Sequence, residues 1–109
     1  MKEKYYYIRD SLKRPVVTVC LLQDNGNIAK GVSICSLMDQ PVKKEGRRWA
    51  RGRALRALGT QSTSGEVARL EAAAAMFDIA EPFFDIMFKS EFNPELSERE
   101  NRILYPSKK

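Results

Sequence analysis

The dipeptide Asn25-Gly26 lies between two runs of β-forming residues, and it restricts the fold more than any other feature of the sequence. The run before it, Pro15 to Leu22, is rich in β-branched residues, and the run after it, Ile28 to Cys35, alternates apolar with polar positions. Because Asn-Gly favours the tight turn that joins antiparallel strands, these runs are predicted to form a hairpin. The aromatic run Tyr5 to Arg9 supplies a third strand, which completes an antiparallel β-meander within residues 4–36.

The rest of the chain has the spacing and the caps of helices. The first helix is predicted from Gln40 to Leu58, with Ser36 or Asp39 as its cap and Gly59 as its stop. Further helices are predicted over Val67–Ala80 after a capping-box spacing from Thr63 to Glu66, over Pro82–Phe88, and from Asn93-Pro94 through Leu104. The predicted fold class is therefore α+β. A single domain spans residues 1–109, with a three-stranded meander in 4–36 and two main helices and short C-terminal helices in 40–105.

Composition argues against most catalytic chemistries. The 109 residues contain no histidine, and the two cysteines do not form a CxxC pair, so no ordinary zinc site and no histidine base is expected. Phosphate-loop, nucleophile-elbow and dinucleotide motifs are absent. We therefore expect a protein that is not an enzyme, with no metal and no cofactor, and we find no export signal or membrane segment. The net charge of +5 is consistent with an anionic partner, but equally with a charge that only keeps the protein soluble.

A helical wheel of residues 40–58 gives one broad apolar arc. Gly46, Ala50 and Ala54 lie four residues apart along its centre, so another backbone or a ligand could come close there. Trp49 lies on the same arc, and it is expected in the core, with a stacking platform as the alternative.

The arginines of this helix divide into two groups. Arg48 points to solvent and Arg51 flanks the arc, whereas Arg47 and Arg53 project from the apolar arc itself. A charge on a packed face is unfavourable unless it is paired and hydrogen-bonded. Arg47 and Arg53 are therefore each expected to meet an acidic side chain, backbone carbonyls or a bound anion.

Two aromatic segments leave alternatives open. Successive rings of Tyr5 to Tyr7 alternate in direction, so at least one faces outward, either to stack on a base or to pack at an edge strand. The apolar run Phe83 to Phe88 either completes the core or partly meets another chain.

The segment from Gly31 to Leu58 resembles a pattern in small phage proteins: a strand ending in G-x-x-x-C-S, then D, then basic residues, then G-R-x-x-A-x-x-R-A. The pattern is carried here by Gly31, Cys35, Ser36, Asp39, Lys43, Gly46, Arg47, Ala50, Arg53 and Ala54. Pro41 departs from it, because the pattern usually has a large apolar residue there. On these residues the chain is similar to the Thoeris anti-defence sponge family, first type.

The resemblance implies a function without catalysis. Members of the family have an N-terminal antiparallel sheet and C-terminal helices, and they assemble into homo-oligomers, here a dimer up to a hexamer. They sequester cyclic ADP-ribose isomers, and some hold cyclic oligonucleotides, without cleaving them. The expected partner is thus a nucleotide second messenger, in the cytoplasm of an infected bacterial host. The ligand-binding residues expected here are Arg47, Arg53, Arg51, Asp39, Lys43 and Tyr7.

Within this hypothesis the arginines hold phosphates, Asp39 accepts from a ribose hydroxyl or orients an arginine, and Tyr7 stacks on a base. An alternative is a small DNA-binding module that lays its sheet in the major groove. Its contacts would then be dominated by Lys30, Lys43, Lys44 and Arg48. A third hypothesis is a phage inhibitor that binds a host protein through Phe83 to Phe88.

Overall fold

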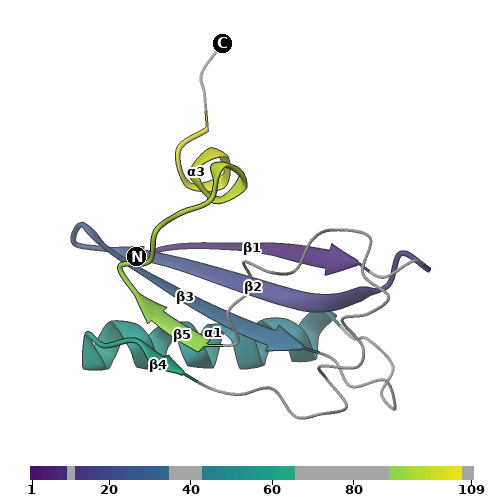
Figure 1. Ribbon diagram of the computed structural model, residues 1–109, viewed down its shortest axis with the longest axis horizontal. Helices are drawn as coiled ribbons and strands as arrows, with labels where there is room; N and C mark the ends of the chain where they lie inside the picture. The colour runs from purple at the N-terminus through teal and green to yellow at the C-terminus, as the bar shows by residue number, and fades with distance from the viewer. Residues whose placement is uncertain (10–11, 35–42, 66–88, 107–109) are drawn as a thin grey trace.

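The protein is seen in a computed structural model that describes residues 1–9, 12–34, 43–65 and 89–106. The strands are β1 (Lys2–Arg9), β2 (Pro15–Asp24), β3 (Asn27–Ile34), β4 (Ser64–Gly65) and β5 (Lys89–Phe92), and the helices are α1 (Lys43–Thr60) and α3 (Glu98–Leu104). The strands form an antiparallel sheet in the order β1-β2-β3-β5-β4, so β1 is an edge strand (Figure 1). The predicted α+β class is confirmed.

The predicted hairpin forms between β2 and β3. Asp24 pairs with Asn27, and the two residues between them, Asn25 and Gly26, have φ angles of 51° and 82°. Two positive φ angles in succession are typical of the type I′ turn, whose twist matches that of the flanking strands. The turn chemistry in the sequence therefore sets the register of the β2–β3 hairpin.

Two strands were not predicted. β5 pairs with β3 through Ala29 and Phe92, and β4 pairs with β5, so the part of the chain expected to be helical over 40–105 also extends the sheet. The expected capping box at Thr63 is wrong, because the Thr63 hydroxyl accepts a hydrogen bond from the Phe92 amide at 3.1 Å and Gly65 lies in β4. The strand β5 has only four residues, so its sequence is too short to show the two-residue alternation by which a strand is recognised.

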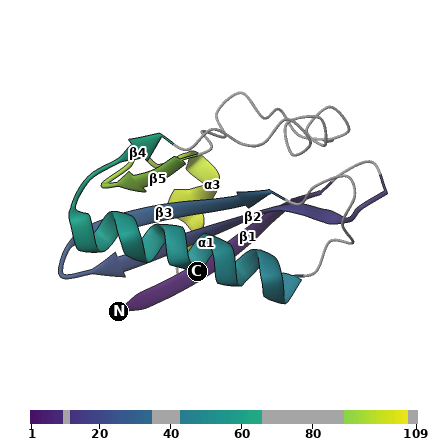
Figure 2. The same ribbon diagram turned by 90° about the horizontal axis from the view of Figure 1, so that it is seen from below.

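The sheet has a hydrophobic cluster on each face. On one face, Val19 and Leu21 of β2 pack with Leu104 of α3. On the other, Cys20 and Leu22 of β2 pack with the alanines of α1. This alternation along one strand follows from the two-residue period of β structure, and the two helices accordingly lie on opposite faces of the sheet (Figures 1 and 2).

Of the two close neighbours expected for the small residues of α1, another backbone or a ligand, the structure shows a backbone, that of the sheet. Ala50 and Ala54 are fully buried, and a Cβ added to Gly31 of β3 would lie 2.1 Å from the Ala50 carbonyl oxygen. A Cβ on Gly46 would lie 2.4 Å from the Thr18 hydroxyl of β2. Glycine on the helix and glycine on the strand therefore let the α1 backbone rest almost directly on the sheet.

The start of the last helix differs from the expectation. Asn93 has a φ of 49°, and its side chain accepts from the Ile28 amide at 2.8 Å, so it closes a turn against β3 and does not cap a helix. The cap is Ser97, whose hydroxyl accepts from the Glu100 amide at 3.1 Å while the Glu100 carboxylate accepts from the Ser97 amide at 2.9 Å. This reciprocal pair is a capping box within the SERE segment.

Some sequence predictions lie outside the described residues. They are the start of the first helix at residues 40–42, its caps Ser36 and Asp39, and the helices over 67–80 and 82–88. The helix α1 ends at Thr60, one residue beyond the expected stop at Gly59. Neither described helix has the length and apolar character needed to cross a bilayer.

Candidate functional site

A row of cations runs along the exposed side of α1. Lys44, Arg47, Arg48 and Arg51 follow the spacing i, i+3, i+4 and i+7, which places them on one helix face, and all four are exposed. We call these four residues the cationic stripe. Within the described part of the chain, no carboxylate pairs with Lys44, Arg47 or Arg48. These three charges are therefore available to an anion.

Arg51 is anchored to the edge strand. Its Nε lies 3.1 Å from Glu3 Oε2, and the Tyr5 hydroxyl donates to the other oxygen of Glu3. That hydroxyl bond lowers the pKa of Glu3 most, opposed by partial burial and supported by Arg51. Burial, followed by the bond to Glu3, raises the pKa of Tyr5. At neutral pH the cluster is thus a carboxylate held between a neutral phenol and a guanidinium.

Cys20 lies beneath this cluster. Its side chain is fully buried, and burial raises the pKa of the thiol to about 12. A thiol with such a pKa carries almost no thiolate at neutral pH, which is the reactive form. Cys20 is therefore part of the core in this structure and is not suited to nucleophilic attack.

Tyr7 lies on the same side of the sheet as α1. It pairs with Thr18 across β1 and β2, and Thr18 is the residue that meets Gly46 of α1. Tyr7 is half-buried on the edge strand, on the side where Arg51 reaches β1. The structure thus brings the predicted aromatic residue to the flank of the helix that carries Arg47 and Arg51.

Arg53 has a partner within the chain. Its Nη1 donates to the Val32 carbonyl at 2.7 Å. Because β5 pairs with β3 only at Ala29 and Lys30, Val32 lies past the end of that pairing on β3, and Arg53 reaches its carbonyl from α1. A backbone carbonyl was one of the three partners expected for this arginine, and a ligand role for Arg53 stays a prediction.

Arg47 and Trp49 are placed differently from the expectation. Both were expected on the packed side of α1, yet Arg47 is exposed and Trp49 is 56% exposed. The positions of α1 directly above Gly31 are occupied by Ala50 and Ala54, whereas the larger Leu55 and Leu58 of α1 are only partly buried against the same cluster. Arg47 and Trp49, which lie near the edges of the apolar arc on a wheel, therefore lie outside the tightly packed line and are exposed.

The structure does not place the two remaining predicted site residues, Lys43 and Asp39, beside the cationic stripe. Lys43 is the first residue of α1, and Asp39 lies outside the described residues. Among the described residues, no three acidic or sulfur side chains gather where a metal ion could bind.

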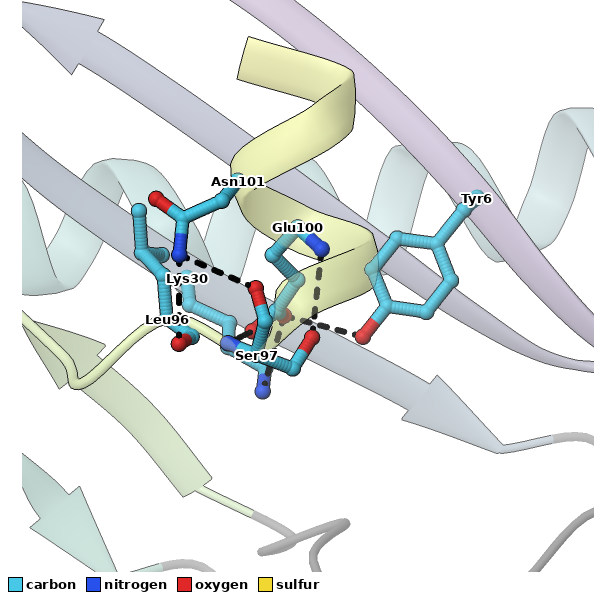
Figure 3. A network of polar contacts seen from close by, with 6 residues as sticks. All are labelled: Tyr6, Lys30, Leu96, Ser97, Glu100 and Asn101. Atoms are coloured by element: carbon cyan, nitrogen blue, oxygen red, sulfur yellow. Dashed lines mark hydrogen bonds and ion pairs between the residues drawn. The ribbon is translucent and has the colours of Figure 1, made fainter. Parts of the chain in front are cut away.

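A buried polar network on the other face was not predicted (Figure 3). Lys30 Nζ lies 3.0 Å from Glu100 Oε2, and the Tyr6 hydroxyl donates to the same oxygen at 2.9 Å. Glu100 is only 1% exposed. Burial raises the pKa of Glu100, but the Ser97 amide, Lys30 and Tyr6 together outweigh burial, so the pKa is lowered overall. This network fixes α3 to the sheet.

Its parts were visible in the sequence only in isolation. Lys30 interrupts an otherwise apolar face of β3, and Glu100 stands at the capping-box position after Ser97. Nothing in the sequence states that two residues 70 positions apart meet. The finding also removes Lys30 from the exposed cations that a DNA-binding module would use.

A comparison of the chain with known protein families, with curated proteins and with solved structures returns no match.

Proposed function

We propose that this protein binds a nucleotide-derived signalling molecule, a cyclic ADP-ribose isomer or a cyclic oligonucleotide, and holds it without cleaving it. In this proposal it is a phage anti-defence protein that acts as a homo-oligomer in the cytoplasm of an infected bacterium. The observation that carries the proposal is the cationic stripe on α1, in which three exposed cations have no carboxylate partner among the described residues.

Phosphate recognition is the chemistry for which such a row is suited. A guanidinium offers parallel N–H donors to two oxygens of one phosphate, and it stays charged at any physiological pH. Arg47 and Arg51 lie one helical turn apart, so each can face a different phosphate of the same ligand. Arg51 is bound to Glu3 through Nε, which fixes the side chain and leaves its terminal nitrogens to a phosphate.

The other predicted site residues have different roles in this proposal. Tyr7 borders the stripe from β1 and can contact a sugar or a base. Arg53 supports the site by joining α1 to β3 through the Val32 carbonyl, and we retain it as a candidate ligand contact. Asp39 and Lys43 come just before or at the start of α1, and we retain them as candidate ligand contacts.

The DNA-binding alternative is less well supported by the geometry. A module that lays its sheet in the major groove needs one bare sheet face. Here α1 covers one face of the sheet and α3 lies on the other, and Lys30 is 8% exposed (Figures 1 and 2). A DNA contact through α1 alone would still be possible, so duplex DNA belongs in the binding test. The host-inhibitor hypothesis depends on residues 83–88, which lie outside the described residues.

The proposal is tested by calorimetric titration with a cyclic ADP-ribose isomer, a cyclic dinucleotide, a cyclic trinucleotide and duplex DNA. We expect heat with at least one of the small ligands, and recovery of that ligand intact after heat denaturation of the protein. The double variant Arg47→Glu/Arg48→Glu should bind it at least roughly 10-fold more weakly, because each lost charge-assisted contact removes about 1.5–3 kcal/mol.

The matched control is Arg102→Glu. Arg102 is an exposed arginine on α3, across the sheet from the stripe, and it contributes only an exposed pair with Glu98 at 3.6 Å. This variant should bind as the parent chain does. Absence of heat with every cyclic nucleotide would refute the proposal, and equal weakening by the control variant would show that only net charge matters. Binding of duplex DNA alone, with steep salt dependence, would favour the alternative.

A further inference from the structure

Gly52 is a residue that the packing of the chain does not explain. It lies in the interior of α1, where glycine is less favourable than alanine because it adds conformational freedom to the unfolded chain. Gly46 of the same helix has a reason, because a Cβ there would meet Thr18 at 2.4 Å. At Gly52 nothing lies within 4 Å of the position that a Cβ would occupy. The bare backbone at this position therefore serves no contact with the described residues.

Trp49 stands beside this bare backbone. Residues three apart on a helix are neighbours on its surface, so the indole of Trp49 borders Gly52. The indole is 56% exposed, although tryptophan is the side chain with the most apolar surface to bury. Arg48, the neighbour of Trp49 and four residues before Gly52, belongs to the cationic stripe and is exposed. A flat aromatic face, an open backbone and a cation without a carboxylate partner among the described residues thus meet on the outer side of α1.

We infer that Trp49 and Gly52 form the base-binding platform of the nucleotide ligand, with Arg48 at its phosphate. The inference rests on the proposed function and specifies which residues recognise the base. A nucleobase stacks on the indole, and its edge lies against the helix backbone at Gly52, where a side chain would hold it away. Stacking on an aromatic ring tolerates any base, since every base has a π face.

The charge of the surface selects this occupant over others. In a homo-oligomer a second copy, which also carries a net charge of +5, would contact other surfaces of the chain, because it does not neutralise this row of cations. A duplex keeps its bases stacked inside, so it cannot offer a base face to an indole without extruding a nucleotide. A small ligand with an accessible base and a phosphate satisfies both the indole and Arg48.

Trp49 is the single tryptophan of the chain, so its fluorescence reports on this surface alone. Titration with a cyclic ADP-ribose isomer, a cyclic dinucleotide and a cyclic trinucleotide should quench the emission to saturation, at the same midpoint that calorimetry gives. Trp49→Ala should weaken binding roughly 5- to 150-fold, the range expected for loss of one base–aromatic stack, and Trp49→Phe should retain part of the affinity.

Gly52→Ala separates the ligand role from a structural role. Alanine is the better helix former, so this variant should melt about 4–8 °C higher than the parent while binding the nucleotide at least roughly 10-fold more weakly. The matched control is Gly59→Ala, two helical turns away, where the added Cβ also meets nothing within 4 Å. The Gly59→Ala variant should also melt at a higher temperature than the parent, and it should bind the nucleotide with unchanged affinity.

The outcomes distinguish the inference from the proposed function. If calorimetry detects a ligand but the emission does not change and Trp49→Ala binds normally, the platform is wrong and the function stands. If Gly52→Ala is more stable and binds unchanged, the close approach of the base is refuted. If no cyclic nucleotide produces heat, the proposed function fails and the platform fails with it.

Discussion

Replacing Gly31 with alanine tests the closest contact in the structure. Gly31 lies on β3 beneath α1, and the new Cβ would lie 2.1 Å from the Ala50 carbonyl oxygen and 2.5 Å from the Ala54 amide nitrogen. Both atoms belong to helix backbone, so no side-chain rotation relieves the clash. The helix must move outward by about 1 Å to restore ordinary van der Waals separation.

The cost of that displacement can be estimated from the packing. Overpacking of a core costs about 1–3 kcal/mol, and we place Gly31→Ala near 3 kcal/mol because the obstacle is rigid backbone on both sides. Outward movement also loosens the contacts of Ala50, Ala54 and Ala57, which are at most 1% exposed. For a domain of this size the midpoint of thermal unfolding should fall by about 12–24 °C.

The assay is urea unfolding followed by circular dichroism, with the free energy of unfolding extrapolated to water. Gly52→Ala serves as the internal comparison, because the same chemical change at an open helix position should raise the free energy of unfolding by about 1 kcal/mol. A Gly31→Ala variant whose unfolding free energy stays within about 0.5 kcal/mol of the parent would refute the close packing of α1 on β3.

Two further substitutions test the polar contacts. Glu100→Gln leaves Lys30, whose side chain is 10% exposed, without its counter-charge and should lower the free energy of unfolding at neutral pH by about 3–5 kcal/mol. Because the pKa of Glu100 is lowered on folding, its stabilisation is present above the unfolded-state value near pH 4.5 and is lost as the pH falls through the folded-state pKa. The parent should therefore lose stability on acidification more steeply than this variant, and parallel pH profiles would contradict the assignment. Arg53→Met keeps the side-chain stem but removes the donor to the Val32 carbonyl, and urea unfolding should show a loss of about 1–3 kcal/mol; an unchanged midpoint would mean that the bond is not maintained in solution.

The parts of the fold that the sequence predicts are those encoded by neighbouring residues. Asn25-Gly26 specifies a turn by its own backbone preferences, and the meander follows from it. The small residues Gly46, Ala50 and Ala54 likewise predicted the buried line of α1, because a helix repeats its faces regularly. In both cases the information lies within one element or one turn.

The candidate site was predicted only in outline. The helical wheel gave Arg47 and Arg53 equivalent environments, whereas in the structure Arg47 is exposed and Arg53 donates to β3. It also placed Trp49 inside, because a wheel describes direction around a helix and contains no information about how far away the neighbouring layer is.

The sequence by itself determined the antiparallel meander, the α+β class and the line of small residues along α1, because local backbone preferences and element periodicity are properties of short segments. Tertiary structure alone decided that β5 joins β3, that Glu100 meets Lys30, and that α1 lies against Gly31 with Trp49 exposed. Those features depend on contacts between residues far apart in the chain, which form only when whole elements pack at fixed distances. The exposed row of cations beside Trp49, on which both proposals rest, is a consequence of that packing.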